Sequence, residues 1–288
     1  QGTENDASMR ARLLPLIRSE DIRPDSSLWR LAIIDLAGAL RRRNLILLLG
    51  FSNVASLYRR SVFGQFWMTI SNIMLILAIG FVWANIWKQP LTEFLPYLTA
   101  GHIFWILMTA SLTDASTTFA TSASYLKELN LPRSTYLLAG IVKQLVVLGH
   151  NLVVLPFVFI ACGLWPTPSV FLVVPALVLT VATLLAASFW ISILGLRFRD
   201  VPNIISSLTT VLFFLTPVIW HKDLIDQDLR ALLIFNPFYI FLELIRAPLL
   251  GYHVDAHYWF IAISILAVNA VVGFVVFAKW RRWITFWL

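Results

Sequence analysis

Six long apolar stretches, separated by polar segments, set the pattern of this chain. A helix needs about 20 apolar residues in a row to cross a hydrocarbon core of about 30 Å. The stretches do not alternate between polar and apolar positions as the strands of a membrane barrel do, and a helix satisfies its own backbone hydrogen bonds in lipid. The pattern therefore predicts an all-α integral membrane protein. Its six transmembrane helices are expected at residues 62–87, 95–119, 136–162, 169–196, 203–220 and 258–279.

The segment before the first predicted span divides into two parts. Residues 1–29 are polar and lack the apolar core of a signal peptide, so we expect a flexible or lightly ordered cytoplasmic tail. Residues 30–58 contain apolar positions, but Arg41, Arg42 and Arg43 interrupt them. An arginine at mid-membrane costs about 2.5–3.5 kcal/mol even on lenient insertion scales. This region therefore predicts one or two amphipathic helices in the cytoplasmic interface, with an ordinary anchor beside the first span as the alternative.

Another unusual segment, residues 222–252, lies between the last two predicted spans. It is rich in apolar residues, yet Asn236 and Pro237 divide it into halves that are too short to cross a membrane. Asparagine can cap a helix, and proline fits the first helical position. We therefore expect two short re-entrant helices that dip into the outer leaflet and line a pore exit, with a peripheral cap as the alternative.

The composition agrees with a membrane protein, because only 13% of the 288 residues are charged, against about 25% in soluble domains. The net charge of +7 has a simple explanation, since lysine and arginine gather on one side of the predicted spans. By the positive-inside rule that side is cytoplasmic, and both termini lie there. We therefore expect a multi-pass protein with membrane lipids around it and no nucleic-acid partner.

The sequence lacks the common motifs of catalysis. No G-x-x-x-x-G-K-S/T phosphate loop occurs, so the chain itself should not hydrolyse ATP, and the five histidines have no metal-ligand spacing. We expect no catalytic residue, no metal site and no cofactor on this chain. One ionisable residue, Asp114, lies among hydroxyl residues of the second predicted span. Such a group inside a membrane is a functional candidate, and a carboxylate in water at the cytoplasmic end is the alternative.

Several short motifs occur in a fixed order around the predicted spans. They read YRRSVFGQFW at 58–67, LKELNLPR at 126–133, RFRDV at 197–201, FLTPVIW at 214–220 and NPF at 236–238, followed by Arg246 and Gly251. Over about residues 30–288 the chain resembles the membrane subunit of ABC-2-type polysaccharide exporters, the permeases for O-antigen, teichoic acid and capsule. Residues 129–131 depart from the family, because many members have an apolar aromatic residue just before the Pro-Arg pair.

The resemblance implies an ABC-2-type transmembrane domain over residues 30–288. It implies a homodimer with two copies of a separate ATPase subunit, which would bind ATP and Mg²⁺. The substrate would be a lipid-linked polysaccharide, such as the O-antigen of lipopolysaccharide biosynthesis, exported across the bacterial cytoplasmic (inner) membrane by a permease that is not itself an enzyme.

Three other functions compete with this one. The first is an ABC-2 permease for a small drug or lipid, and the second is a membrane-embedded transferase acting on a glycan lipid. A proton-driven carrier, the third, would need paired intramembrane ionisable groups, and only Asp114 comes close.

The short amphipathic segment at residues 124–135 predicts the surface on which the ATPase subunit docks. A helix along the membrane surface can pass force from a soluble motor to the spans. We expect Lys127, Glu128 and Arg133 to pair with charges of the motor, beside Leu131 and Pro132. A solvated loop is the alternative.

Arginines before the first span predict a cytoplasmic access site for an anionic lipid head, because a guanidinium group matches phosphate oxygens with several donors. Plain topology and binding of bulk anionic lipid are the alternative. The residues are Arg41, Arg42, Arg43, Arg59 and Arg60.

Spans one and five are expected to line the channel. The resemblance implies that these spans meet across the dimer, and aromatic faces stack on sugars. Interfacial anchoring and packing are the alternative roles for the aromatic residues. The predicted lining residues are Phe66, Trp67, Trp83 and Trp87 of the first span, Phe213, Phe214 and Trp220 of the fifth, and the hydrogen-bonding residues Asn72, Asn85, Ser207, Thr209 and Thr210.

Overall fold

The structure is a computed structural model that describes residues 28–57, 64 and 66–288. Every regular element in these ranges is a helix, which confirms the all-α class. Most of the predicted tail lies outside the described residues, as do two of the predicted access residues, Arg59 and Arg60.

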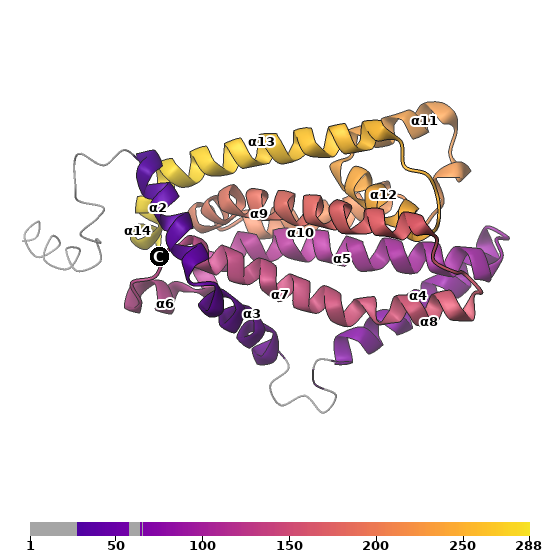
Figure 1. The fold of residues 1–288 in the computed structure, drawn as a ribbon, viewed down its shortest axis with the longest axis horizontal. Helices are drawn as coiled ribbons and strands as arrows, with labels where there is room; N and C mark the ends of the chain where they lie inside the picture. Colours follow the sequence, from indigo (N-terminus) through magenta and orange to yellow (C-terminus); the bar gives the residue numbers. More distant parts are fainter. Residues whose placement is uncertain (1–27, 58–63, 65) are drawn as a thin grey trace, which may run out of the picture.

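Long helices run side by side along the long axis of the molecule (Figure 1). In the part of the chain that the structure describes, five helices are long and apolar enough to cross a membrane, and they coincide with five of the six predicted spans. They are α4 Phe66–Ile86, α5 Leu91–Thr121, α7 Ser134–Leu152 continued by α8 Val154–Ala161, η3 Pro168–Leu172 continued by α9 Val173–Arg197, and α13 Ala256–Trp280.

Helix α5 forms the centre of the bundle. Within its most apolar stretch 78% of the residues are buried, against 11% for α4 and 17% for α13, so other helices enclose α5 but not those two. Small residues permit the close approach, because a Cβ at Gly195 of α9 would overlap the Ser116 carbonyl of α5. The exposed apolar faces of α4 and α13 are left for lipid or for another chain.

The prediction for the fifth span, residues 203–220, is wrong at its end. Helix α10 covers only Val201–Leu215, which is too short to cross a membrane alone. The residue before a proline disfavours helical backbone, and here Thr216 precedes Pro217. Residues 216–219 continue as buried non-helical chain, which is tolerated at membrane depth only where protein covers it.

Residues 222–252 contain two short helices divided at Asn236, as predicted. After η4 Lys222–Leu224, α11 Gln227–Leu232 runs into η5 Leu233–Phe235, and α12 Pro237–Leu249 follows at a bend of 102°. Asn236 caps α12, since its Oδ1 accepts hydrogen bonds from the backbone N–H groups of Phe238 at 3.0 Å and Tyr239 at 3.4 Å. We call this end of the molecule, at the right of Figure 1, the α12 end.

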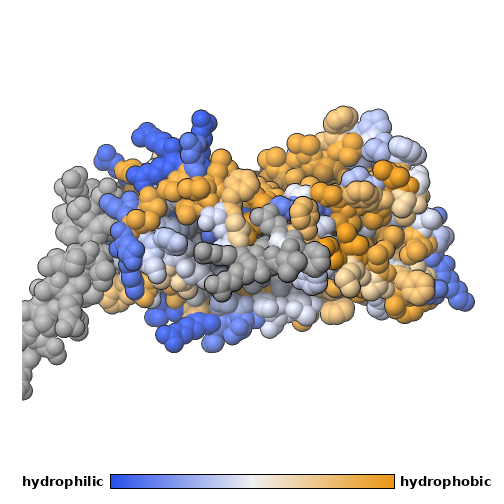
Figure 2. All heavy atoms as spheres, turned by 90° about the horizontal axis from the view of Figure 1, so that it is seen from below, coloured by the Kyte–Doolittle hydropathy of each residue, from blue (hydrophilic) through white to orange (hydrophobic). Residues whose placement is uncertain are grey.

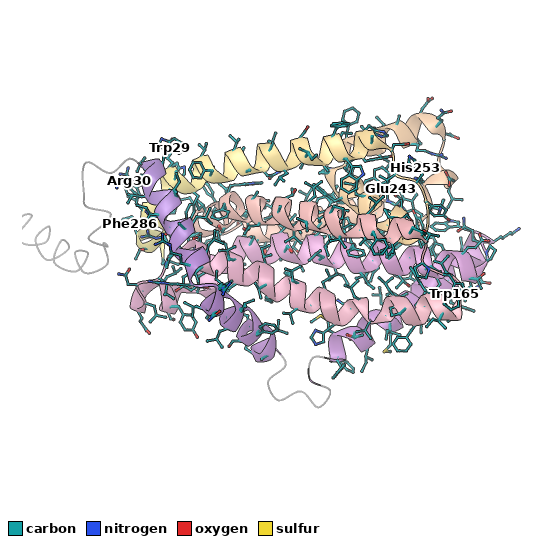
Figure 3. All side chains as sticks on the ribbon, in the orientation of Figure 1. Trp29, Arg30, Trp165, Glu243, His253 and Phe286 are labelled. Atoms are coloured by element: carbon teal, nitrogen blue, oxygen red, sulfur yellow. The ribbon has the colours of Figure 1, made fainter. Side chains whose placement is uncertain are left out.

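The opposite end, which we call the α2 end, also contains short elements (Figure 1). Figure 2 shows hydrophilic residues gathered at this end and hydrophobic residues over much of the same face toward the α12 end. Trp29, Arg30 and Phe286 lie at the α2 end, and Trp165 and His253 lie at the other (Figure 3). The elements of the α2 end are α2 Leu28–Arg41, α3 Arg43–Leu57, α6 Ala123–Glu128, η6 Arg281–Trp283 and α14 Ile284–Trp287.

Helices α2 and α3 pack in different ways. Helix α2 crosses the end of the bundle and buries Ala32, Asp35 and Ala39, which recur every three to four residues on one face. Helix α3 instead runs along α7, where a Cβ at Gly50 would overlap Val142. Helix α2 therefore has the form expected of an interfacial helix, and its position in the membrane interface stays a prediction.

Candidate functional site

Helix α6 and the loop after it form the predicted coupling segment. Leu126 is buried among the neighbouring helix ends and holds α6 in place. Lys127 and Glu128 are exposed, and Leu131 and Pro132 are half-buried. The segment thus presents charges of both signs at its surface, where a soluble subunit could reach them.

Arg133 does not share this exposure. Its side chain is only 1% exposed, and its Nη2 donates a hydrogen bond to Thr285 Oγ1 of α14 at 3.3 Å. In this conformation the guanidinium group packs against the chain's own residues. Direct pairing of Arg133 with a motor subunit stays a prediction, and it would require the loop to open.

A buried carboxylate of α2 joins three parts of the α2 end. Asp35 Oδ2 accepts a hydrogen bond from the Arg133 N–H at 3.0 Å, and Oδ1 accepts from the Ser134 N–H at 2.9 Å and Ser134 Oγ at 2.6 Å. Arg281, just after α13, donates from Nη2 to Asp35 Oδ2 at 3.2 Å. We call Asp35, Arg133, Ser134 and Arg281 the Asp35 cluster.

The Asp35 cluster caps α7 from another helix. The first N–H groups of a helix have no partner within it, and the macrodipole favours a negative charge there. Asp35 supplies both the acceptor and the charge, so a movement of α2 reaches the start of the third span directly. The sequence held a signal that we missed, since Asp35 is the only acidic residue between positions 28 and 57.

The predicted lipid-access residues can be placed only in part. Arg41, Arg42 and Arg43 are exposed at the junction of α2 and α3. Their exposure leaves the guanidinium groups accessible, and their binding of a phosphate stays a prediction.

The predicted channel-lining residues divide into two groups. The exposed group consists of Phe66, Trp67 and Asn85 of α4 and Ser207, Thr210 and Phe214 of α10. The other group is half-buried or buried and consists of Asn72, Trp83, Trp87, Thr209, Phe213 and Trp220.

Members of the second group contact other helices of the same chain. Asn72 Nδ2 donates to Asn151 Oδ1 of α7 at 2.9 Å, and the Phe213 ring lies 5.7 Å from the Trp105 ring of α5. The first group is exposed, so it can face a channel, lipid or a second copy. Their lining of a channel stays a prediction.

A polar cavity of about 250 Å³ lies between α3, α5 and α7. Lys143 Nζ is 2.7 Å from Asp114 Oδ2 in its wall, and Gln144 donates to the same oxygen. Counted at 1.5 Å per residue, Asp114 lies roughly 10 Å before the end of α5 and Lys143 roughly 14 Å after the start of α7. Asp114 is therefore an ion-paired group inside the bundle. We missed Lys143, whose signal was a single lysine inside the apolar run 136–162.

Charge is also buried at the α12 end, around Arg246. Its side chain is 1% exposed, Nη1 donates to the Pro217 carbonyl at 2.5 Å, and Nη2 donates to Glu243 Oε2 at 2.8 Å. The guanidinium carbon lies 3.9 Å from the centre of the Tyr97 ring, and the Tyr97 hydroxyl also donates to the Pro217 carbonyl, at 3.1 Å. Lys222 pairs with Glu243, which Figure 3 shows among the helices at this end. We call Tyr97, Lys222, Glu243 and Arg246 the Arg246 cluster.

Comparison with known families assigns the chain to one of them. Residues 44–250 match the model of the family described as ABC-2 type transporter. This chain belongs to the ABC-2 type transporter family. The match runs from α3 through α12, so it includes the polar cavity, the short α10 and the two helices joined at Asn236. The resemblance expected from the sequence motifs is confirmed.

Relatives of this ABC-2 protein include two named permeases. An O-antigen export system permease protein RfbA of Myxococcus xanthus is 24% identical over 197 residues, which cover 68% of this chain and 76% of that protein. A protein of the same name from Klebsiella pneumoniae is 24% identical over 182 residues, which cover 62% and 70%. As an ABC-2 protein, the chain is a multi-pass membrane permease that associates with an ABC ATPase subunit.

Proposed function

We propose that this ABC-2 permease exports a lipid-linked polysaccharide of the O-antigen type across the bacterial cytoplasmic (inner) membrane. The observation that carries the proposal is the similarity to two permeases named for O-antigen export, over 62–68% of the chain. ATP and Mg²⁺ bind to a separate ATPase subunit, whose hydrolysis of ATP drives export, and the permease carries out no chemistry of its own.

The proposed complex contains two copies of the permease and two ATPase subunits. The α2 end is the cytoplasmic end, and the channel lies between the copies, along α4 and α10. The exposure of both helices supports this arrangement, because only 11% of the most apolar stretch of α4 is buried and Thr209 is the one α10 residue that is buried. The 15 residues of α10 extend only about 22 Å, less than the hydrocarbon core of about 30 Å, which suits a helix that borders water.

Force from the ATPase reaches the spans through α6 and α2 in this proposal. Lys127 and Glu128 contact the ATPase, and the Asp35 cluster connects α2 to the start of α7. The exposed arginines at positions 41–43 receive the anionic head of the lipid carrier.

A gene deletion tests the proposed function. The encoding bacterium without this chain is expected to lose its surface polysaccharide and to accumulate lipid-linked glycan inside, and the wild-type chain restores export. The charge swap Lys127→Glu with Glu128→Lys is expected to lower export while the permease remains at its normal level in the membrane. A deletion strain with unchanged surface polysaccharide would contradict the proposal.

Export of a small drug or lipid is the second candidate, and one observation favours it. An apolar groove of about 490 Å³ lies between α5, α9, α10, α12 and α13, with Met108, Leu184, Leu208 and Phe238 among its walls. Such a groove fits an acyl chain. A purified complex whose ATPase responds equally to a glycan-bearing lipid and to the same lipid without glycan would favour this second function.

A further inference from the structure

Five residues that line the polar cavity between α3, α5 and α7 offer hydrogen-bond acceptors to it, beside others that can also donate. The hydroxyls of Thr117 and Thr118 donate to the Asp114 carbonyl oxygen at 3.2 and 2.8 Å, and the Thr121 hydroxyl donates to the Thr117 carbonyl at 3.1 Å. On α3 the Ser56 hydroxyl likewise donates to a carbonyl one turn earlier, at 2.9 Å. A hydroxyl has one hydrogen and two lone pairs. Each of these groups donates its hydrogen to a carbonyl of its own helix and so offers lone pairs to the cavity.

The ion pair in the wall leaves one further acceptor for a ligand, Asp114 Oδ1. Lys143 and Gln144 both donate to Asp114 Oδ2, and none of the described residues donates to Oδ1. The side chains of Asp114 and Lys143 are 32% and 18% exposed, so both reach the cavity. Their charges cancel, which leaves no net positive charge to attract an anion.

We propose that this cavity binds the sugar ring next to the lipid carrier of a lipid-linked glycan, an inference that rests on the proposed function. Sugar hydroxyls supply the donors that Asp114 Oδ1 and the threonine oxygens require. A phosphate offers strong acceptor oxygens, which would face these lone pairs, and the charge of Lys143 is already balanced by Asp114.

The place and size of the cavity agree with a single ring at the level of a lipid head. The pair of Asp114 and Lys143 lies roughly 10–14 Å inside the α2 end of the helices. The volume of about 250 Å³ lies below the roughly 300–1,000 Å³ of pockets for drug-sized ligands, so the cavity holds one ring rather than an oligosaccharide.

The test uses the complete permease–ATPase complex in lipid nanodiscs with two probes. One probe is a polyprenyl diphosphate that carries a single N-acetylhexosamine, and the other is the same lipid without sugar. Wild-type complex is expected to bind the sugar-bearing lipid at least about tenfold more tightly, the effect of about one hydrogen bond to a charged group. The charge-neutral double variant Asp114→Asn with Lys143→Met is expected to lose this ratio.

The control is Ser188→Ala, which removes a buried hydroxyl of α9 outside the cavity and is expected to keep the ratio. An unchanged ratio in the double variant overturns the inference and leaves the proposed function standing. A wild-type complex that does not distinguish the two lipids overturns both.

A labelling experiment covers the case in which the double variant fails to fold. Cys162 is the only cysteine, so a Cys162→Ser background permits a single new thiol in the cavity, Thr118→Cys. The sugar-bearing lipid is expected to slow reaction of this thiol with a small methanethiosulfonate reagent severalfold, and the sugar-free lipid to leave it unchanged. Equal rates with both lipids would mean that the cavity holds only water.

Discussion

Each end of the bundle holds a buried cluster of charge, and the two clusters work in opposite senses. At the α2 end a carboxylate, Asp35, accepts hydrogen bonds at the start of α7. At the α12 end a guanidinium group, Arg246, donates to the Pro217 carbonyl just after α10 ends. Each charge has the sign that the helix macrodipole favours at that terminus. At the start of α7 the carboxylate accepts from backbone N–H groups that a helix end leaves unpaired, and beyond α10 the guanidinium group binds a carbonyl of the non-helical chain.

The clusters differ in what they join. The Asp35 cluster connects α2 and the segment after α13 to the start of α7, and all three lie at the end where the proposed ATPase would act. The Arg246 cluster connects α5, α10 and α12 within the bundle and fixes the short α10 in place. The first cluster is therefore suited to passing movement between elements, and the second to holding them still.

Breaking the Arg246 cluster should have the largest effect. Arg246→Met leaves the buried Glu243 carboxylate with only the half-buried Lys222 as a charged partner, and removing one member of a buried ion pair costs about 3–5 kcal/mol. The thermal unfolding midpoint of the detergent-purified permease measures the loss. The control is Arg230→Ala, which removes an exposed ion pair with Asp223 and should cost at most about 1 kcal/mol. Equal midpoints for both variants would mean that the cluster does not fix α10.

Asp35→Asn should lower the stability of the protein less than Arg246→Met does, and it should impair export more. The amide retains an acceptor for one backbone N–H group but loses the charged hydrogen bonds, worth about 1.5–3 kcal/mol. We expect ATP hydrolysis in the complex to continue while glycan export falls, because α2 no longer moves with α7. The double variant with Arg281→Met should recover part of the stability, since it removes the unpaired guanidinium group. Parallel losses of hydrolysis and export would indicate a purely structural role for Asp35.

The long helices could be predicted from the sequence because the length of an apolar run is a local property. The cap at Asn236 could be predicted for the same reason, as it acts on the residues that follow it directly. The end of α10 could be only half predicted. Pro217 was visible, but the groups that satisfy its carbonyl lie 29 and 120 residues away, in Arg246 and Tyr97.

The charge clusters could not be predicted because their members are distant in sequence. Asp35 lies 99 residues from Ser134 and 246 from Arg281. Asp114 and Lys143 lie 29 residues apart on neighbouring spans, so each looked like an isolated ionisable group. No local spacing indicates that two such residues meet, and the burial of Arg133 follows from the same long-range packing.

Asn236→Ala removes uncharged hydrogen bonds at the α12 end and should lower the stability less than the two variants above. Loss of a helix cap costs about 0.5–2 kcal/mol. Asn236 Nδ2 also donates to Thr216 Oγ1 at 2.8 Å, which ties the start of α12 to the end of α10. Asn236→Asp keeps the cap acceptor and loses this donor, so its unfolding midpoint should fall between those of the wild type and Asn236→Ala. A midpoint for the aspartate variant at or below that of the alanine variant would show that capping is not the main contribution.

The smallest expected effect is a pH dependence of stability that involves a histidine beside only one of the two clusters. The His221 ring lies 4.6 Å from the Tyr97 ring, beside the Arg246 cluster, whereas the Asp35 cluster contains no histidine. Burial lowers the pKa of the His221 imidazole below its ordinary value of 6.5. Four charged neighbours also act on it: Asp223 and Glu243 raise this pKa, and Arg246 and Lys222 lower it.

The direction of the pH effect follows from this lowered pKa. Below the ordinary value the unfolded chain binds a proton that the folded chain resists, so the stabilising contribution is complete above about pH 6.5 and declines as the pH falls. Between about pH 7.5 and about pH 5.5, the wild-type unfolding midpoint should therefore drop more than that of His221→Gln. The matched control is His257→Gln at an exposed position, whose drop should equal that of the wild type. Equal drops of the midpoint for His221→Gln and the wild type would show that protonation of His221 does not destabilise the α12 end.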